Sequence, residues 1–231
     1  MQPTTALNAI QTDIVRELFL RGNLRFAQMN TNAVPNDHFS YHVRQLIKYG
    51  LVERVDNGYR LSTTGKTRAI MLSEHESSFI HQALIALRVV VSNHEHGQEF
   101  FLVQERTKVP FKGVLALPGG KVLFAEDVTT AARRTLRYET GLDCSFDMRG
   151  IVHYKDEYEG EIVQDKFFFV LRASNPVGSL KANGRTGKNF WMKLDELRTS
   201  AQTHQGLLEI IDLASGSGFG FREQTFTTAS Y

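Results

Sequence analysis

The first third of the chain contains apolar residues at helical spacing, separated by short polar turns. Apolar residues that recur every three or four positions predict amphipathic helices, and four such segments are present. Two short segments flank an Asp-Asn-Gly sequence, a pattern typical of a tight β-hairpin. The predicted helices are 5–21, 24–29, 37–49 and 63–72, and the predicted strands are 51–55 and 59–61. Residues 1–75 are therefore predicted to form a small domain with a hairpin between its third and fourth helices.

The remainder of the chain alternates between apolar, strand-like segments and two amphipathic helices. A polar stretch at residues 73–78 is the expected joint between the two parts. The predicted strands are 81–91, 99–104, 115–117, 146–154, 162–173 and 190–192, and the predicted helices are 128–140 and 205–214. Residues 79–214 are thus predicted to form a second domain of mixed α and β structure. Residues 215–231 are rich in Gly, Ser and Thr and are expected to be a flexible tail.

The second domain is organised around residues 117–142, a glycine-rich loop followed by a helix that stops at a glycine. This stretch resembles the Nudix box, in which a glycine and a later glutamate precede an Arg-Glu-aliphatic-x-Glu-Glu-x-Gly-aliphatic sequence. The positions that match in register are Gly120, Glu126, Arg134, Leu136, Glu139, Gly141 and Leu142. Thr135 and Tyr138 stand where the family has glutamates.

Two further segments resemble the same family, residues 110–121 before the box helix and residues 190–197 at a late strand-to-helix corner. The resemblance implies an α/β/α sandwich on a mixed sheet, which binds a nucleoside diphosphate linked to another group. The fold class expected for the whole chain is α+β with two domains. Structural roles in the box, chiefly tying its loop to its helix, are implied for Gly120, Glu126, Arg134 and Gly141.

The metal-binding half of the box is depleted. Nudix hydrolases split a diphosphate by attack of water, with Mg²⁺ or Mn²⁺ held by carboxylates. Positions 135, 138 and 139 lie at i, i+3 and i+4 of the predicted helix, so their side chains converge. Glu139 is the one carboxylate among them, because Thr135 offers a hydroxyl and Tyr138 a phenol. Glu139 is thus the candidate catalytic residue and metal ligand, with weak Mg²⁺ or Mn²⁺ binding expected, and activity as an enzyme is left open.

Basic residues suggest another way to hold phosphates. Residues 173–194 contain no Asp or Glu but several Lys and Arg, and basic loops bind phosphate without a metal. Together with the glycine-rich loop before the box helix, they form the predicted ligand-binding set. Its members are Gly119, Gly120, Lys121, Arg185 and Lys188.

The first domain resembles the winged helix-turn-helix of bacterial and archaeal regulators, on residues 39–46 and 49–54. The resemblance implies that its third helix enters a DNA major groove and that its hairpin contacts phosphates. The residues expected to contact DNA are His38, Ser40, Tyr41, Arg44, Arg54 and Arg60. Residues 1–73 carry nine Lys or Arg against five Asp or Glu, an excess of four positive charges. Winged helices also serve as protein-interaction modules, and this alternative remains open.

Composition restricts the setting of the protein. Net charge is +2, and Cys144 is the lone cysteine, so an internal disulfide is excluded. The N-terminus lacks the pattern of a signal peptide, and the longest apolar runs are too short to span a bilayer. A soluble, cytoplasmic protein without a membrane partner is expected.

Three functions are weighed on these grounds. The preferred hypothesis is a homodimeric, DNA-binding transcription regulator whose degenerate Nudix domain senses a nucleoside-diphosphate-linked metabolite. The alternative is a metal-dependent Nudix hydrolase of a nucleoside diphosphate derivative, with the winged helix as an accessory module. A third hypothesis, a protein-interaction module without turnover, predicts neither DNA binding nor hydrolysis.

Overall fold

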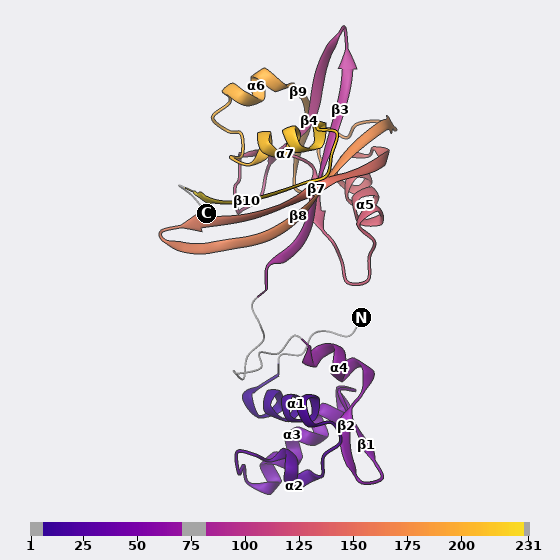
Figure 1. Cartoon of the computed structure of the whole chain (residues 1–231), viewed down its shortest axis with the longest axis vertical. Coiled ribbons are helices and arrows are strands. Elements are labelled where there is room, and N and C mark those ends of the chain that lie inside the picture. The colour runs from indigo at the N-terminus through magenta and orange to yellow at the C-terminus, as the bar shows by residue number, and fades with distance from the viewer. Residues whose placement is uncertain (1–6, 71–81, 229–231) are drawn as a thin grey trace. The chain divides into compact units, whose positions relative to one another are not determined.

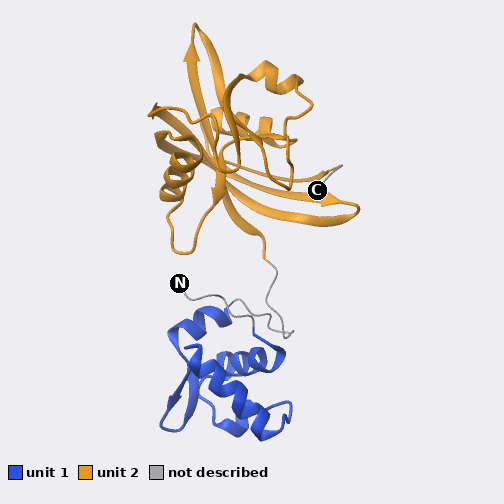
Figure 2. Ribbon diagram, turned by 180° about the vertical axis from the view of Figure 1, so that it is seen from behind, with its two compact units in different colours: residues 1–81 blue, residues 82–231 orange. Residues whose placement is uncertain are grey.

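The computed structural model of the chain describes residues 7–70 and 82–228 (Figure 1). The chain divides into two compact units, residues 1–81 and 82–231 (Figure 2). The joint expected at residues 73–78 lies outside the described residues. No helix within the described ranges is long and apolar enough to cross a membrane.

Unit 1 has the predicted order of three helices, a hairpin and a helix. Its elements are α1 (Ala9–Arg21), α2 (Phe26–Met29), α3 (Asn36–Lys48), β1 (Val52–Val55), β2 (Gly58–Leu61) and α4 (Thr63–Ala69). Asn8 caps α1, because its side chain accepts a hydrogen bond from the Gln11 backbone N–H. The antiparallel pairing of β1 with β2 forms the hairpin expected of a wing.

The core of unit 1 joins all three longer helices to the hairpin. Buried apolar residues of α1, α3, α4 and the hairpin form one cluster, which includes Ile14, Phe39, Ala69 and Leu61. Gly65 of α4 lies directly against this core. A Cβ added at Gly65 would lie 1.9 Å from the carbonyl oxygen of Leu51, so α4 approaches the chain before β1 closely enough to exclude any side chain.

Unit 2 is built on a mixed sheet with helices on both faces. Its elements are β3 (Leu84–Glu95), β4 (Gln98–Arg106), β5 (Leu115–Ala116), β6 (Gly119–Lys121), α5 (Val128–Thr140), β7 (Asp143–Tyr158), β8 (Glu161–Val177), β9 (Gly187–Lys193), α6 (Leu194–Thr199), α7 (Leu207–Ser215) and β10 (Gly220–Thr227). The sheet order is β10-β7-β8-β3-β4-β5, with β6 on β3 and β9 on β4. The β3–β8 and β10–β7 pairs are parallel, and the remaining pairs are antiparallel.

Alternation along β3 separates the two faces of the sheet. Leu87 and Val89 belong to a cluster with the apolar residues of α5, whereas Ala86 and Val90 belong to a cluster with α6 and α7. The α+β class and the mixed sheet between helices therefore follow from two alternating apolar faces. Arg88 lies between Ala86 and Val90, so a cation occupies the α7 face of a core strand.

The expectation of a flexible tail at residues 215–231 is wrong for most of that segment. Strand β10 pairs in parallel with residues 150–157 of β7, and Phe226 is buried against Tyr154, with ring centroids 4.9 Å apart. The Gly and Ser residues mark only the turn into this strand. The sequence of β10 has no alternating apolar pattern, because β10 is an edge strand with mostly exposed side chains. Its partner strand also lies some 70 residues earlier in the chain, so neighbouring residues do not reveal the pairing.

Candidate functional site

The loop of the box is tied to its helix by one ion pair. Arg134 Nε donates to Glu126 Oε1 at 2.6 Å, and Arg134 Nη2 donates to Glu126 Oε2 at 2.8 Å. The same guanidinium donates to the Lys121 carbonyl at 3.0 Å. Hydrogen bonding to Arg134 lowers the pKa of Glu126 to about 2. Helix α5 ends at Gly141, whose φ of +77° is the left-handed conformation of a C-terminal cap.

Glu139 is already committed to contacts within the protein. The side chain is buried, and its Oε2 accepts hydrogen bonds from Thr186 N at 3.1 Å and from Thr186 Oγ1 at 3.0 Å. Gln104 Nε2 donates to the same oxygen at 3.3 Å. The Glu139 carbonyl accepts a further bond from Asn189 Nδ2 at 2.7 Å. Glu139 therefore holds the loop before β9 against the box helix.

The other two positions of that helix face provide little for a metal. Thr135 Oγ1 is buried, has no hydrogen-bond partner among the described residues and lies beside Gly120, whose added Cβ would meet it at 2.8 Å. Tyr138 points outward and is 61% exposed. Within residues 7–70 and 82–228, no group of three His, Cys, Asp or Glu side chains is placed to hold a metal. A hard cation needs several oxygen ligands, so these residues do not fit the family's Mg²⁺ or Mn²⁺.

The predicted ligand-binding residues are dispersed. Gly119 and Gly120 lie in β6, and Lys121 is exposed at its end. Arg185 is exposed and stacks on Tyr138, with its guanidinium carbon 5.9 Å from the ring centroid. Lys188 is exposed on β9. None of these five residues lines the cavity found in unit 2.

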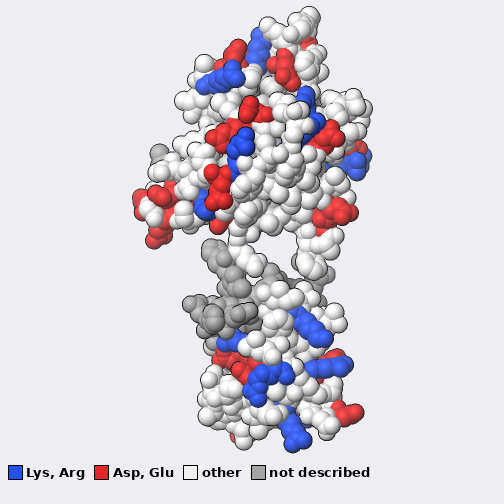
Figure 3. Space-filling view, viewed as in Figure 1, with Lys and Arg blue, Asp and Glu red and all other residues white. Residues whose placement is uncertain are grey.

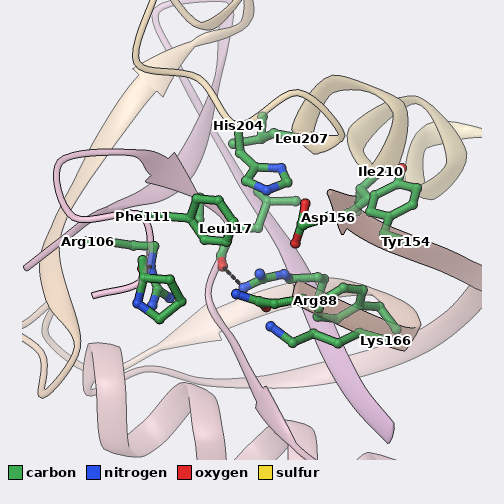
Figure 4. A pocket seen from close by; sticks show the side chains of 14 residues that line it. Arg88, Arg106, Phe111, Leu117, Tyr154, Asp156, Lys166, His204, Leu207 and Ile210 are labelled. Atoms are coloured by element: carbon green, nitrogen blue, oxygen red, sulfur yellow. Dashed lines mark hydrogen bonds between the residues drawn. The ribbon is translucent and has the colours of Figure 1, made fainter. Parts of the chain in front are cut away.

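A cavity of about 110 Å³ lies instead on the α7 face of the sheet (Figure 4). It is bounded by strands β3, β4, β5, β7 and β8, by the loop after β4 and by the start of α7. Its lining residues are Arg88, Arg106, Pro110, Phe111, Ala116, Leu117, Tyr154, Asp156, Gln164, Lys166, Phe168, His204, Leu207 and Ile210. Three cationic side chains and one carboxylate thus share an otherwise largely apolar and aromatic pocket.

The three cations that line this cavity outnumber the one carboxylate that lines it. Burial, together with the neighbouring Arg106, lowers the pKa of Arg88 to about 10. Burial and the nearby Arg88 lower the pKa of Lys166 to about 8. Asp156 is the acidic group among them, and burial raises its pKa. Like charges held together out of water are unfavourable unless an anion joins them, so the cavity is suited to an anionic ligand.

His204 faces the same cations as a neutral group. Burial and then Arg88 lower the pKa of His204 to about 4, so the imidazole is uncharged at neutral pH. The Gly206 backbone N–H donates to its Nδ1 at 3.3 Å, which places the remaining proton on Nε2. His204 therefore adds a neutral hydrogen-bond donor to the pocket.

The cavity adjoins the predicted loop, although its residues were not predicted from the sequence. Arg88 Nη1 donates to the Leu117 carbonyl at 3.1 Å, and a Cβ at Gly119 would lie 2.9 Å from the same nitrogen. One signal for the site was present in the sequence, because Arg88 interrupts an apolar strand on a face that must be buried. Lys166 and His204 gave no comparable signal, because Lys166 stands at the polar start of an apolar strand and His204 lies among polar residues.

The protonation of Lys166 predicts how ligand affinity depends on pH. A depressed lysine pKa means that the ligand-free folded state gains stability as pH rises from about 8 towards 10.5. An anionic ligand needs the charged form, so its affinity is expected to fall by about tenfold from pH 7 to pH 9. Isothermal titration calorimetry with ADP at both pH values measures this. Lys166→Arg keeps the charge and should remove the decline; an equal decline in that variant would contradict the assignment.

The predicted DNA-contacting residues of unit 1 lie on α3 and the hairpin. His38, Tyr41 and Arg44 are exposed, and His38 Nε2 lies 3.0 Å from Nε2 of the buried His42. Ser40 is half-buried. Arg54 donates to the Tyr59 hydroxyl at 3.1 Å, and Arg60 forms an ion pair with Glu53. Figure 3 shows Lys and Arg side chains among acidic groups on the visible face of unit 1.

The loop, the box helix and the sandwich define unit 2 as a Nudix-type domain. Residues 83–213 match the NUDIX domain family, and because this is more than half of the chain, the chain belongs to that family. Residues 5–78 match the N-terminal domain of methanogenesis regulatory protein FilR1. The protein thus combines a Nudix domain with an N-terminal domain of a regulatory type. A search of curated proteins gave no significant match.

Two solved structures show the same sandwich. The MutT protein of Bacillus halodurans is 22% identical, with a TM-score of 0.53 over 64% of this chain and 93% of that chain. The NUDIX domain of Shewanella oneidensis NrtR, solved with ADP ribose, is 16% identical, with a TM-score of 0.50 over 58% of this chain and 88% of that chain. At these identities the likeness concerns the fold.

Proposed function

We propose that the protein is a DNA-binding transcription regulator whose Nudix domain senses a nucleoside-diphosphate-linked metabolite. The observation that carries this proposal is the convergence of Arg88, Arg106 and Lys166 on one cavity with a single carboxylate. A diphosphate would supply the missing negative charge, and the aromatic walls suit a sugar or base. The ADP ribose in the related NrtR domain supports a ligand of this class.

The state of the box favours binding over hydrolysis. Glu139 is the one carboxylate on the former metal face, and its Oε2 is used by Thr186 and Gln104. Moving Glu139 Oε2 onto a metal would leave the Thr186 backbone N–H without its acceptor, at a cost of about 1–3 kcal/mol, whereas Thr186 Oγ1 and Gln104 Nε2 would keep Gln104 Oε1 and Asn189 Oδ1. These contacts favour a ligand that is held in the cavity on the α7 face and is not hydrolysed at the box.

Unit 1 supports the regulatory half of the proposal. Its match to the FilR1 N-terminal domain, its helix order and its excess of positive charge all favour DNA as partner. Tyr41 and Arg44 are exposed on α3 and would face the groove, whereas Arg60 would first have to leave Glu53. A homodimer with two such heads would let the ligand alter their spacing on DNA.

One experiment tests sensing and DNA binding together. The full chain is screened by thermal shift with ADP, ADP-ribose and nucleotide sugars, once with Mg²⁺ and once with EDTA. We expect stabilisation by at least one nucleotide to the same extent in both, because the pocket cations replace a metal. The same nucleotide should change binding to genomic DNA fragments at low salt, measured by fluorescence anisotropy, by at least fivefold.

Two results would overturn the proposal. Absence of DNA binding at low salt, with and without the nucleotides, would rule out the DNA-binding regulator. Steady Mg²⁺-dependent release of nucleoside monophosphate that Glu139→Gln abolishes would establish a hydrolase instead. A protein that both binds DNA and hydrolyses the nucleotide is also distinguishable, because hydrolysis would consume the nucleotide during the anisotropy measurement.

A further inference from the structure

One polar atom at the wall of the cavity lacks a partner. Gln164 is 9% exposed, and its Oε1 is buried with no hydrogen-bond partner in the described parts of the chain. Buried side-chain oxygens in folded proteins are nearly always paired with a donor, so this one calls for a donor from outside the protein. Gln164 lines the cavity, so a turn of its amide about the last side-chain bond would bring Oε1 to such a donor.

The neighbour of Gln164 across the sheet is a second acceptor. Asp156 on β7 is directly opposite Gln164 on β8, so both side chains leave the sheet on the cavity face. Asp156 is 6% exposed, and Figure 4 shows its carboxylate pointing into the cavity. Two oxygen acceptors on directly opposed residues therefore lie side by side, about the spacing of one cross-strand pair.

The cationic side chains of the cavity lie next to these two acceptors. Lys166 follows Gln164 by two residues on β8, and it interacts electrostatically with both Asp156 and Arg88. Arg88 in turn lies over the ring of Phe168, with its guanidinium carbon 4.7 Å from the centroid. The cavity thus has an acceptor end, formed by Gln164 and Asp156, and a cationic end. A ligand that fits both ends carries adjacent hydrogen-bond donors close to an anionic group.

We infer that Gln164 and Asp156 bind the two neighbouring hydroxyls of a ribose whose phosphate lies on Arg88, Lys166 and Arg106. Adjacent hydroxyls present two donors side by side, as two opposed acceptors require. A nucleobase edge fits less well: adenine mixes donors with acceptors and would leave a carboxylate facing a lone pair, and guanine holds its two adjacent donors far from the phosphate of its nucleotide. The cavity therefore selects phosphorylated ribose over phosphorylated deoxyribose. This inference rests on the proposed function and specifies which part of the metabolite this cavity recognises.

Paired sugar phosphates test the inference on the full chain. Binding of ribose 5-phosphate, 2-deoxyribose 5-phosphate and inorganic phosphate is measured by calorimetry. The wild type is expected to bind the ribose compound at least tenfold more tightly than the deoxyribose compound. Gln164→Met keeps the length of the side chain and removes the acceptor, and it should reduce this preference to threefold or less while inorganic phosphate binds as before.

Matched variants separate recognition from folding. Gln98→Met makes the same change at an exposed position of β4 and should keep the full preference. Asp156→Asn retains the shape of the side chain and should also weaken the preference. A melting temperature close to that of the wild type shows that each variant is folded.

The outcomes distinguish this inference from the proposed function. If nucleotides stabilise the wild type but it binds the two sugar phosphates equally, or if Gln164→Met keeps the tenfold preference, the inference is overturned and the sensor proposal stands. If no nucleotide or sugar phosphate binds, both fail. Loss of phosphate binding in Gln164→Met also overturns the inference, because the residue would then act on the anionic end.

Discussion

Gly65→Ala is expected to unfold unit 1 while unit 2 stays folded. The new methyl group would lie 1.9 Å from the Leu51 carbonyl oxygen and 3.2 Å from the Leu61 side chain, and a backbone oxygen cannot turn aside. Overpacking of this kind costs about 3 kcal/mol or more, a large share of the stability of so small a domain. DNA binding should be lost, whereas the nucleotide-induced thermal shift of unit 2 should persist.

Thr64→Ala is the matched control for this prediction. Thr64 precedes Gly65 in α4 and is exposed, so this variant places an alanine at the neighbouring position of the same helix without an overlap. Circular dichroism melting and anisotropy with DNA should match the wild type in this control. Retention of DNA binding by Gly65→Ala would mean that α4 is not needed for the DNA-binding surface.

Arg88→Met is expected to weaken nucleotide binding by about a hundredfold. A buried, charge-assisted interaction with a phosphate contributes about 2–3 kcal/mol, and Arg88 is the central cation of the cavity. Stability of the ligand-free protein should change by less than about 1 kcal/mol, because relief of the repulsion from Arg106 and Lys166 offsets the loss of the hydrogen bond to the Leu117 carbonyl. Calorimetry with ADP-ribose and thermal melting without ligand measure the two effects separately.

Arg198→Met removes an exposed arginine of α6 outside the cavity and should leave both measurements unchanged. Arg88→Lys keeps the charge but not the two-pronged geometry, so an intermediate loss is expected. Unchanged affinity in Arg88→Met would show that the ligand binds elsewhere, with the basic loop around Arg185 as the next candidate.

Much of the fold could be predicted from local patterns. Helical spacing, the Asn-Gly turn and the box sequence each depend on residues close together in the chain, and each led to the element observed. The predicted strands at residues 146–154 and 162–173 were in the right places but too short, because β7 and β8 extend beyond their apolar centres into polar residues. Strand β10 was missed altogether, because its partner is distant and its side chains are mostly exposed.

The candidate site was harder to predict, because its residues meet only through the sheet. Arg88, Asp156 and Lys166 lie on three strands, and their meeting depends on register across parallel and antiparallel pairs. In the box, by contrast, the sequence alone showed that Thr135 and Tyr138 replace two glutamates of the family pattern. What the sequence did not indicate was the present use of Glu139, because its hydrogen-bond donors come from residues 104 and 186.

The contacts of Glu139 bear on how a metal site could be built into this domain by design. Because Glu139 fastens the loop before β9, replacing Thr135 and Tyr138 with glutamates would not by itself free a third carboxylate for a cation. The loop would also need another anchor before Glu139 could be released. A redesigned box would therefore exchange the anchoring of this loop for affinity towards a cation, and both changes would have to be made together.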